Sequence, residues 1–203
     1  MNHEEWANGN PFIHFQTLYT EAAKTEVFDP TRAALATVDA KGQPSVRFVL
    51  VRGMYEDSFV FYTDYRSKKA QHLDENPLVA LTWHWSSTGV QIRVEGRAQR
   101  AEPSVSDEYF ASRNRGSQLG AWSSFQSRTL SARSDLIDSL AEHEDKFRDK
   151  PVGRPPHWGG YRVDPTLIEF WFDRPDRLHD RFEYTLDNGN GVPLGSVLSD
   201  GDV

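Results

Sequence analysis

The chain has 203 residues, with 23 Lys and Arg against 30 Asp and Glu, so its formal net charge is −7. This length suits one domain with a short appendage, and the acidic balance argues against nucleic-acid binding. The absence of Cys excludes disulfides, thiolate metal sites and a Cys nucleophile. No stretch is long and apolar enough to span a membrane. The acidic start, Met1–Trp6, is unlike a secretory signal, so we expect a cytoplasmic protein.

The first thirty residues predict one helix. Up to Pro11 the chain is polar, and we expect it to be frayed. From Phe12 to about Val27 the apolar residues recur at helical spacing, and Asp29-Pro30 ends the pattern. This segment is therefore interpreted as an amphipathic helix.

Five strands follow in quick succession. Short apolar or alternating runs predict them at residues 33–38, 45–51, 58–63, 78–85 and 90–99. The second would present Val46, Phe48 and Leu50 on one face. Between the third and fourth strands, Ser67 occupies an N-cap position and predicts a short helix over 68–75.

Helices dominate the next part of the chain. Pro103 is suited to the first position of a helix, with Ser104 and Asp107 as a weak capping signal. Residues 131–147 predict a second helix, whose buried stripe would be Leu136, Leu140, Ala141 and Phe147. The Gly- and Ser-rich segment 115–127 has room for a helical turn.

Two last strands are predicted at 160–172 and 177–184. Since strands mostly follow one another without crossover helices, the fold class is β-rich α+β, an antiparallel barrel or sandwich with peripheral helices. We divide the chain into an N-terminal arm and helix (1–30), the main domain (31–185) and a loose, Asp- and Gly-rich tail (186–203).

Arg177, His179 and Arg181 form the first candidate site. On a strand these alternate residues would share a face, with Leu178 packed behind them. Three such groups repel one another unless an anion or a π-system lies among them. Ion pairs with Asp176 or Asp180 on a solvated face are the alternative.

Two further patterns point to phosphate. Ser67-Lys68-Lys69 places lysines at a helix N-terminus, where they oppose the helix dipole unless an anion binds. Tyr109, Arg113 and Ser117 would share a face if the helix continued, and their groups suit a phosphate monoester. Asn114 and Gly116 make that continuous helix doubtful, and solvated lysines are the simpler reading of the pair.

Other chemistries lack support in the sequence. The seven His are scattered without metal-ligand spacing, so no metal site is expected. Neither a nucleophile elbow nor a phosphate-cradling Gly-Lys-Ser/Thr loop is present. A domain with anion sites and no nucleophile needs a cofactor for difficult chemistry.

Several segments, in order, resemble the pyridoxamine 5′-phosphate oxidase family over about Asp29 to Tyr184. They are Arg47–Arg52, Phe61–Thr63, Ser67–Ala70, Tyr109–Arg113, Gly116–Trp122, Pro155–Arg162, Ile168–Trp171 and Arg177–Arg181. The resemblance implies an FMN-binding split barrel and a homodimer with active sites at the subunit interface. It also implies oxidation of pyridoxamine or pyridoxine 5′-phosphate to pyridoxal 5′-phosphate, a form of vitamin B6, with dioxygen as acceptor and hydrogen peroxide as product.

The resemblance also assigns site residues by position. Those implied to hold FMN are Arg47, Phe48, Val49, Leu50, Arg52, Tyr62, Thr63, Lys68, Lys69, Gln91, Gln126, Ser127, Trp171 and Arg181. Those implied to hold the substrate are Arg52, Tyr109, Arg113, Ser117, Arg177 and His179. Arg177 and His179 would lie over the substrate ring as the catalytic pair.

The chain departs from the family pattern at three places. Arg52 and Lys68 stand where the family usually has Lys and Arg, and the usual C-terminal Arg-Leu-x-Pro ending is absent. Two alternatives therefore stay open at this point. They are an FMN oxidase of the same fold with another substrate, as in phenazine pathways, and a flavin-binding protein without turnover.

Overall fold

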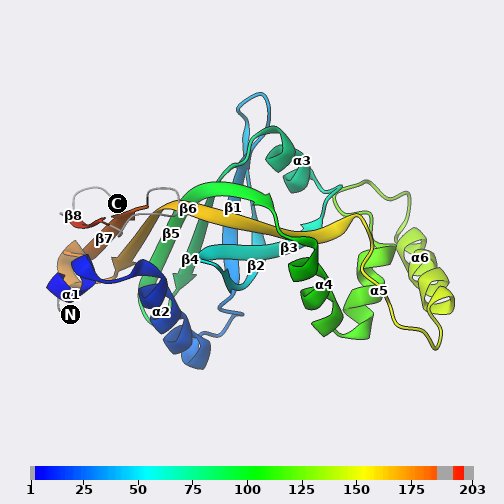
Figure 1. The fold of residues 1–203 in the computed structure, drawn as a ribbon, viewed down its shortest axis with the longest axis horizontal. Coiled ribbons are helices and arrows are strands. Elements are labelled where there is room, and N and C mark those ends of the chain that lie inside the picture. The colour runs from blue at the N-terminus through cyan, green and yellow to red at the C-terminus, as the bar shows by residue number, and fades with distance from the viewer. Residues whose placement is uncertain (1–2, 187–193, 199–203) are drawn as a thin grey trace.

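Six antiparallel strands close into a barrel in the computed structural model, which describes residues 3–186 and the backbone of 194–198. Their order is β3-β2-β1-β4-β5-β6, and β6 also pairs with β3. The strands are β1 (Arg32–Val38), β2 (Pro44–Tyr55), β3 (Ser58–Asp64), β4 (Leu78–Trp85), β5 (Val90–Arg100) and β6 (Trp158–Phe172), with β7 (Asp180–Thr185) and β8 (Leu194–Leu198) beyond β6. The predicted β-rich fold, an antiparallel split barrel with peripheral helices, is confirmed (Figure 1).

The helices gather around the barrel rather than between its strands. They are α1 (His3–Asn8), α2 (Pro11–Thr25), α3 (Lys68–Glu75), α4 (Pro103–Ser112), α5 (Arg115–Ser123) and α6 (Arg133–Lys146), with a 3₁₀ turn, η1 (Pro175–Arg177). Figure 1 places α4, α5 and α6 at one end of the long axis, and α1, β7 and β8 at the other. Among the residues described, no helix combines the length and apolar character needed to cross a membrane.

Aromatic side chains fill much of the barrel. Phe59, Trp83 and Trp85 are almost fully buried, and the Phe15 ring of α2 lies 4.9 Å from that of Phe59 and 5.2 Å from that of Trp83. Burial of such large rings supplies a major part of the folding free energy. The apolar face predicted for this helix therefore covers the barrel.

The long strand β6 joins the two ends of the molecule. Its first half pairs with β3 and its second half with β7, while β5 runs beside most of its length. At its start, a Cβ on Gly159 would lie only 2.0 Å from the hydroxyl of Tyr65, so only glycine allows this approach. The next residue, Gly160, donates its N–H to Oγ of the buried Ser106, which ties α4 to the strand.

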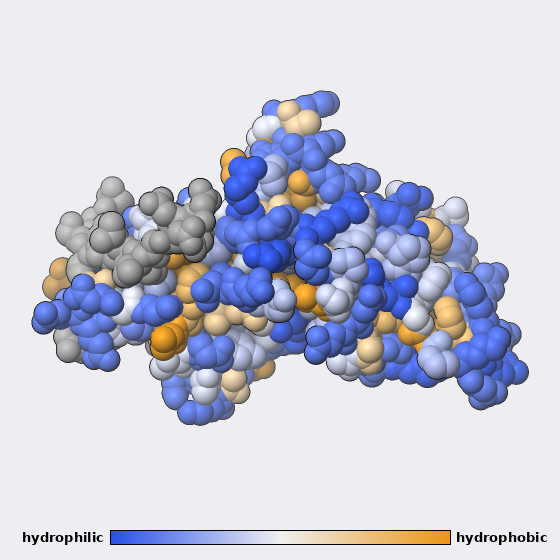
Figure 2. All heavy atoms as spheres, in the orientation of Figure 1, coloured by the Kyte–Doolittle hydropathy of each residue, from blue (hydrophilic) through white to orange (hydrophobic). Residues whose placement is uncertain are grey.

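One face of β2 is apolar and points outward. Val46 and Phe48 are 68% and 71% exposed, and Leu50 is 38% exposed. The predicted common face of these residues is confirmed, but it does not contribute to the core of this chain. Elsewhere the surface is mostly hydrophilic, with apolar groups in small separate patches on the side shown in Figure 2.

The chain termini differ from expectation. The prediction of a frayed segment up to Pro11 is wrong for α1, because the Trp6 ring stacks on His14 and packs against Phe170 and Phe172. In the segment 186–203, predicted to be a loose tail, residues 194–198 form β8 and supply hydrogen bonds to the edge of β7. The rest of that segment, apart from Leu186, lies outside the described residues.

Two helix predictions also need correction. In α6, Ala141 is exposed and Leu136, Leu140 and Phe147 are only half-buried, so no fully buried stripe exists. The predicted capping of α4 by Ser104 and Asp107 does not occur, since Asp107 instead pairs with Arg154 at 2.6 Å. The Gly- and Ser-rich segment forms α5, a longer helix than the single turn expected.

Candidate active site

A cleft of about 590 Å³ lies between the barrel and the α4–α5 junction. Strands β2 and β3, the start of α3, the two helix ends and the segment after α5 all contribute to its walls. The lining residues are Phe48, Val49, Leu50, Arg52, Tyr62, Thr63, Lys69, Tyr109, Ser112, Arg113, Asn114, Ser117, Gln126 and Trp158. Predicted cofactor and substrate residues from five separate stretches of sequence therefore share one cavity.

The three residues of the predicted phosphate site meet although the helix is broken. Helix α4 ends at Ser112, Arg113 is its C-cap residue, and Asn114 caps α5 by accepting the Ser117 N–H at 2.8 Å. Tyr109, Arg113 and Ser117 nevertheless all line the cleft. The break lets Arg113 turn inward at the junction, where a continuous helix would have fixed its direction.

Arg113 is prepared for a ligand. Its guanidinium lies 4.7 Å from the Trp158 ring centroid, and its buried Nη1 has no hydrogen-bond partner. Burial, and to a lesser degree the charge of Arg52, lowers the pKa of Arg113. An anion bound between Arg113 and Arg52 would satisfy the free donor and offset the repulsion.

Three parallel aromatic rings form one wall of the cleft. The Tyr62 and Tyr109 centroids are 3.8 Å apart, and Trp158 lies 5.5 Å from Tyr62, with interplanar angles of 14° and 9°. Burial raises the pKa of Tyr62 to about 12, so its hydroxyl stays protonated at neutral pH. The sequence analysis did not identify Trp158, Ser112 or Asn114 as site residues. For Trp158, the signal in the sequence was the Trp-Gly-Gly segment that resembles the family.

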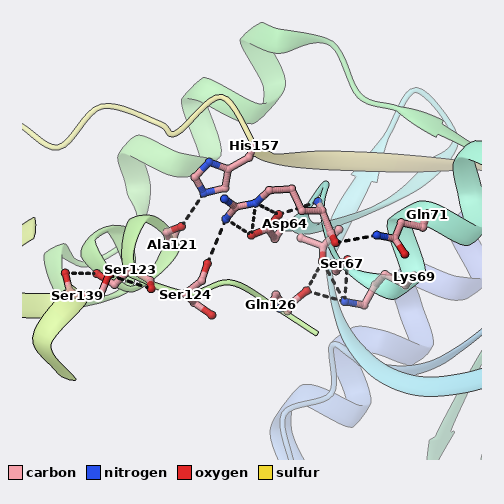
Figure 3. A network of polar contacts seen from close by, with 12 residues as sticks. Asp64, Ser67, Lys69, Gln71, Ala121, Ser123, Ser124, Gln126, Ser139 and His157 are labelled. Carbon is pink, nitrogen blue, oxygen red and sulfur yellow. Dashed lines mark hydrogen bonds and ion pairs between the residues drawn. The ribbon is translucent and has the colours of Figure 1, made fainter. Parts of the chain in front are cut away.

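Lys69 also lines the cleft. Its Nζ donates to Gln126 Oε1 at 2.7 Å and to Thr63 Oγ1 at 3.0 Å (Figure 3). Burial, together with the charge of Arg47, lowers the pKa of Lys69 to about 8. Ser67 caps α3 as predicted, by accepting the Ala70 N–H.

Lys68 and Ser127 do not line the cleft. Both line a neighbouring pocket of about 350 Å³ rather than the cleft, together with Arg66 and Arg128. Neighbouring residues therefore face different cavities. Lys69 on α3 and Gln126 on the loop line the cleft, whereas Lys68 and Ser127 line the second pocket. The two lysines expected at one anion site line different cavities.

Two more basic residues lie on β2. Arg47 donates to Thr37 Oγ1 and Ser45 Oγ, both at 2.7 Å, and burial lowers its pKa. Arg52 lines the cleft and reaches Asp29 Oδ2 at 3.3 Å. Arg47 is thereby held by residues of β1 and β2, and Arg52 by the segment that precedes β1.

The remaining predicted cofactor residues form a row across β5, β6 and β7. Gln91 pairs with Trp171, and Trp171 pairs with Arg181. Arg181 Nη2 donates to the buried Glu169 at 2.7 Å. Trp171 Nε1 and Arg181 Nε are buried without a partner.

The predicted strand ridge of Arg177, His179 and Arg181 is wrong. Arg177 ends the η1 turn with φ of +60°, as Pro175 and Asp176 bend the chain before β7 begins. Leu178 is 72% exposed rather than packed behind the ridge. The His179 ring instead lies 4.4 Å from Trp171, and its Nδ1 accepts the Arg174 N–H. His179 therefore joins the Gln91–Trp171–Arg181 row by ring contact.

The cleft and the row lie far apart in one chain. Strand β6 meets Tyr62 through Gly160 and meets Gln91 through Trp171, eleven residues later. At the rise of a strand this separation is roughly 35 Å. One chain alone does not unite the two groups of ligand residues.

The unsatisfied hydrogen-bond donors indicate what kind of ligand the cleft and the row can bind. Four buried side-chain atoms in the described part of the chain lack a hydrogen-bond partner, and three of them belong to Arg113, Trp171 and Arg181. All three are N–H donors, so the missing partner is an acceptor. A phosphorylated, acceptor-rich ligand with a flat ring suits these donors and the aromatic wall. No group of three or more His, Asp or Glu suited to a metal ion occurs among the described residues.

Sequence comparisons connect this arrangement to known proteins. Residues 19–143 match the profile of the family described as pyridoxamine 5′-phosphate oxidase. Residues 158–192 match the pyridoxine 5′-phosphate oxidase C-terminal dimerisation region. A pyridoxine/pyridoxamine 5′-phosphate oxidase of Acaryochloris marina is 46% identical over 89% of this chain and 83% of its own. One of Cupriavidus metallidurans is 49% identical over 86% of this chain and 82% of its own.

Solved structures show the same architecture. PhzG from Burkholderia lata 383, in complex with tetrahydrophenazine-1-carboxylic acid, superposes with a TM-score of 0.88 at 28% identity, covering 97% of this chain and 96% of that one. A pyridoxamine 5′-phosphate oxidase-related, FMN-binding protein from Nostoc punctiforme has a TM-score of 0.76 at 18% identity, over 95% and 99% of the two chains, and supports the fold alone.

Proposed function

Because the chain belongs to the pyridoxamine 5′-phosphate oxidase family, we propose that its cleft and its Gln91–Trp171–Arg181 row are the two halves of an FMN-dependent active site. The enzyme oxidises pyridoxamine or pyridoxine 5′-phosphate to pyridoxal 5′-phosphate. The observation that carries the proposal is the convergence of Tyr109, Arg113 and Ser117 on one cavity with Lys69.

The substrate phosphate is assigned to the α4–α5 junction. Arg113 offers a free buried donor, while Tyr109 and Ser117 add hydroxyl groups within the same cavity. A guanidinium and two hydroxyls match the acceptor oxygens of a phosphate monoester. Arg52, held by Asp29, adds positive charge between this site and the rest of the cleft.

FMN is the cofactor, and when bound it supplies the two-electron acceptor that no side chain can provide. Lys69, Thr63 and Gln126 present a hydrogen-bonded group of polar side chains in the same cleft. Gln91, Trp171 and Arg181 offer further donors, two of which are unsatisfied in the single chain. These residues hold and orient the cofactor, and the aromatic wall of Tyr62, Tyr109 and Trp158 limits access of water.

Two subunits complete each site in this proposal. Trp171 and Arg181 of the row lie inside the segment that matches the dimerisation region, about 35 Å along β6 from the cleft. The outward apolar face of Val46, Phe48 and Leu50 adjoins the cleft and suits burial against a second copy. A homodimer would then bring the row of one subunit to the cleft of the other.

Arg177 and His179 are assigned to the substrate ring. His179 is fixed against Trp171, and Arg177 ends the η1 turn two residues before it. In the dimer these groups would enter the cleft with the row and orient the reacting carbon. Dioxygen as the final acceptor, hydrogen peroxide as product and a cytoplasmic location are parts of the same proposal; peroxide release and cell fractionation test them.

Oxidation of a phenazine precursor is the second candidate, since PhzG shares the fold over nearly the whole chain. The relatives with 46–49% identity are nevertheless vitamin B6 oxidases, against 28% for PhzG. A phenazine acid also carries no phosphate to satisfy the Arg113 site.

A direct assay tests the function. The purified protein is expected to be yellow, or to become so on reconstitution with FMN, and to form aldehyde and peroxide from pyridoxine 5′-phosphate in air. A yellow protein that forms neither would favour a flavin-binding protein or another substrate. A colourless protein that cannot take up FMN would contradict the entire assignment.

A further inference from the structure

The loop that carries Gln126 into the cleft is held by an ion pair outside the cleft. Asp64, directly at the end of β3, is almost fully buried, and the side chain of Arg66, two residues later, pairs with it. Arg66 Nη2 lies 2.6 Å from Asp64 Oδ2, and Nε lies 3.0 Å from Oδ1. Burial opposes ionisation of Asp64, but the hydrogen bonds and charge of Arg66 outweigh it and lower the pKa of the carboxyl group. Both groups therefore stay charged at neutral pH, and two nitrogens of Arg66 bind the two oxygens of Asp64.

The same guanidinium reaches the segment that follows α5. Arg66 Nη2 also donates to the backbone carbonyl of Ser124 at 3.2 Å, and its guanidinium lies 4.9 Å from the ring centroid of Phe125. Ser124 is the C-cap residue of α5, and Phe125 is the first residue beyond it. One arginine thus contacts two successive residues at the point where the loop leaves the helix.

Other contacts hold α5 itself but not this loop. His157 contacts the Ala121 carbonyl at 3.2 Å, and Ser123 Oγ contacts the Ser139 carbonyl at 3.4 Å. Both act at or before residue 123. Beyond the helix, Arg66 is the link that joins Ser124 and Phe125 to the barrel through Asp64.

The next residue after Phe125 is Gln126, whose Oε1 accepts hydrogen bonds from both Lys69 and Thr63. A shift of the chain at Ser124 or Phe125 would move Gln126 away from these donors. We propose that Arg66, anchored on Asp64, is a positioning residue for the cofactor-binding part of the cleft, acting through the loop to place Gln126 beside Lys69. This inference rests on the proposed function, because it treats Gln126 as part of the FMN site.

A double-mutant cycle on FMN affinity tests the proposal. We expect Arg66→Ala and Gln126→Ala each to raise the Kd of FMN about tenfold, as for the loss of a hydrogen bond to a charged group. The double variant should bind FMN no worse than Gln126→Ala alone, because Arg66 acts only through that side chain. The Kd is measured by quenching of flavin fluorescence, well below each variant's unfolding temperature.

Gln91→Ala provides the matched control. Gln91 is also assigned to FMN but belongs to β5, at the far end of β6 from the loop. The effects of Arg66→Ala and Gln91→Ala on the Kd should therefore multiply. Arg66→Lys is the second variant if Arg66→Ala does not fold, since a lysine can pair with Asp64 but lacks the fork that also reaches Ser124; it too should weaken FMN binding only while Gln126 is present.

The outcomes separate this inference from the proposed function. Wild-type protein that binds FMN, with Arg66 variants of unchanged Kd or with effects that multiply in the Gln126→Ala background, would overturn the positioning role alone. Wild-type protein that binds no FMN would overturn the proposed function itself.

Discussion

Lys69 donates a 2.7 Å hydrogen bond to Gln126, a residue 57 positions further along the chain. Burial and the charge of Arg47 lower the pKa of Lys69 to about 8 in the free protein. We assign the FMN phosphate to Lys69; its negative charge favours the charged amine, so FMN binding above pH 8 requires uptake of a proton. FMN affinity should be constant below about pH 7.5 and fall as the pH rises above 8, by at most about tenfold per pH unit. Fluorescence titrations from pH 6.5 to 9.5 measure this dependence.

Lys69→Met is the control for the titration. It removes the titrating amine while keeping a long side chain, so FMN should bind more weakly and with a flat profile across pH 8. An unchanged fall in affinity above pH 8 in this variant would assign the titration to another group.

Arg113→Ala should separate substrate binding from cofactor binding. The variant loses the buried donor aimed at the substrate phosphate, so KM for pyridoxine 5′-phosphate should rise roughly 10- to 100-fold. FMN content should remain that of the wild type. Steady-state aldehyde formation and the flavin spectrum measure the two quantities, with Arg133→Ala on the exposed start of α6 as the matched control. Loss of FMN without a change in KM would contradict the assignment.

Mixed dimers test whether two subunits share each site. With pyridoxine 5′-phosphate well below the wild-type KM, Arg113→Ala and Arg177→Ala should each be nearly inactive alone. Random assembly of an equal mixture gives half heterodimers, each with one intact site of two, and should therefore restore about a quarter of wild-type activity. The same two variants mixed under conditions without subunit exchange give the baseline activity. Sites formed within one chain would show no recovery.

Val46→Asp should prevent dimerisation. Val46 is 68% exposed on β2 and does not line the cleft, so a charge there would be buried unpaired in the proposed interface. Analytical ultracentrifugation should show monomers with little activity. Ile137→Asp, at a 56% exposed position on α6, is the matched change and should leave the dimer intact. A dimeric, active Val46→Asp protein would exclude this face from the interface.

Glu169→Ala should destabilise the fold. Glu169 is buried and accepts a 2.7 Å hydrogen bond from Arg181, so its removal leaves that guanidinium unpaired and costs about 3 kcal/mol. Glu95→Ala removes an exposed partner of Arg93 and should cost less than about 1 kcal/mol. Urea unfolding of the FMN-free proteins compares the two free energies of unfolding.

Much of the fold follows from local sequence pattern. The strands, α2 and α3 lie close to their predicted positions, because alternation, helical spacing and the Ser67 cap are local signals. The packing of α1 was missed since it depends on Trp6 meeting Phe170 and Phe172, more than 160 residues away. The local spacing of apolar residues does not indicate contacts between such distant parts of the chain.

The candidate site was predictable by residue but not by arrangement. Tyr109, Arg113 and Ser117 do meet, although the helix that suggested their common face is broken at Arg113 and Asn114. The ridge at Arg177 failed because a period of two presumes a strand, whereas Pro175 and the positive φ angles of Asp176 and Arg177 form a turn. The roughly 35 Å between cleft and row arises from the pairing of β6, which residue spacing does not reveal.

The length of β6 has a consequence for the proposed dimer as a whole. In that dimer each β6 strand would begin beside the cleft of one catalytic centre and end in the row that serves the other, with a register shift at Gly96 and Pro165 between them. The two β6 strands would then connect the two catalytic centres. A change in the geometry of either β6 strand would disturb both centres. The activity of the site at one subunit's cleft would therefore depend on the conformation of the other subunit.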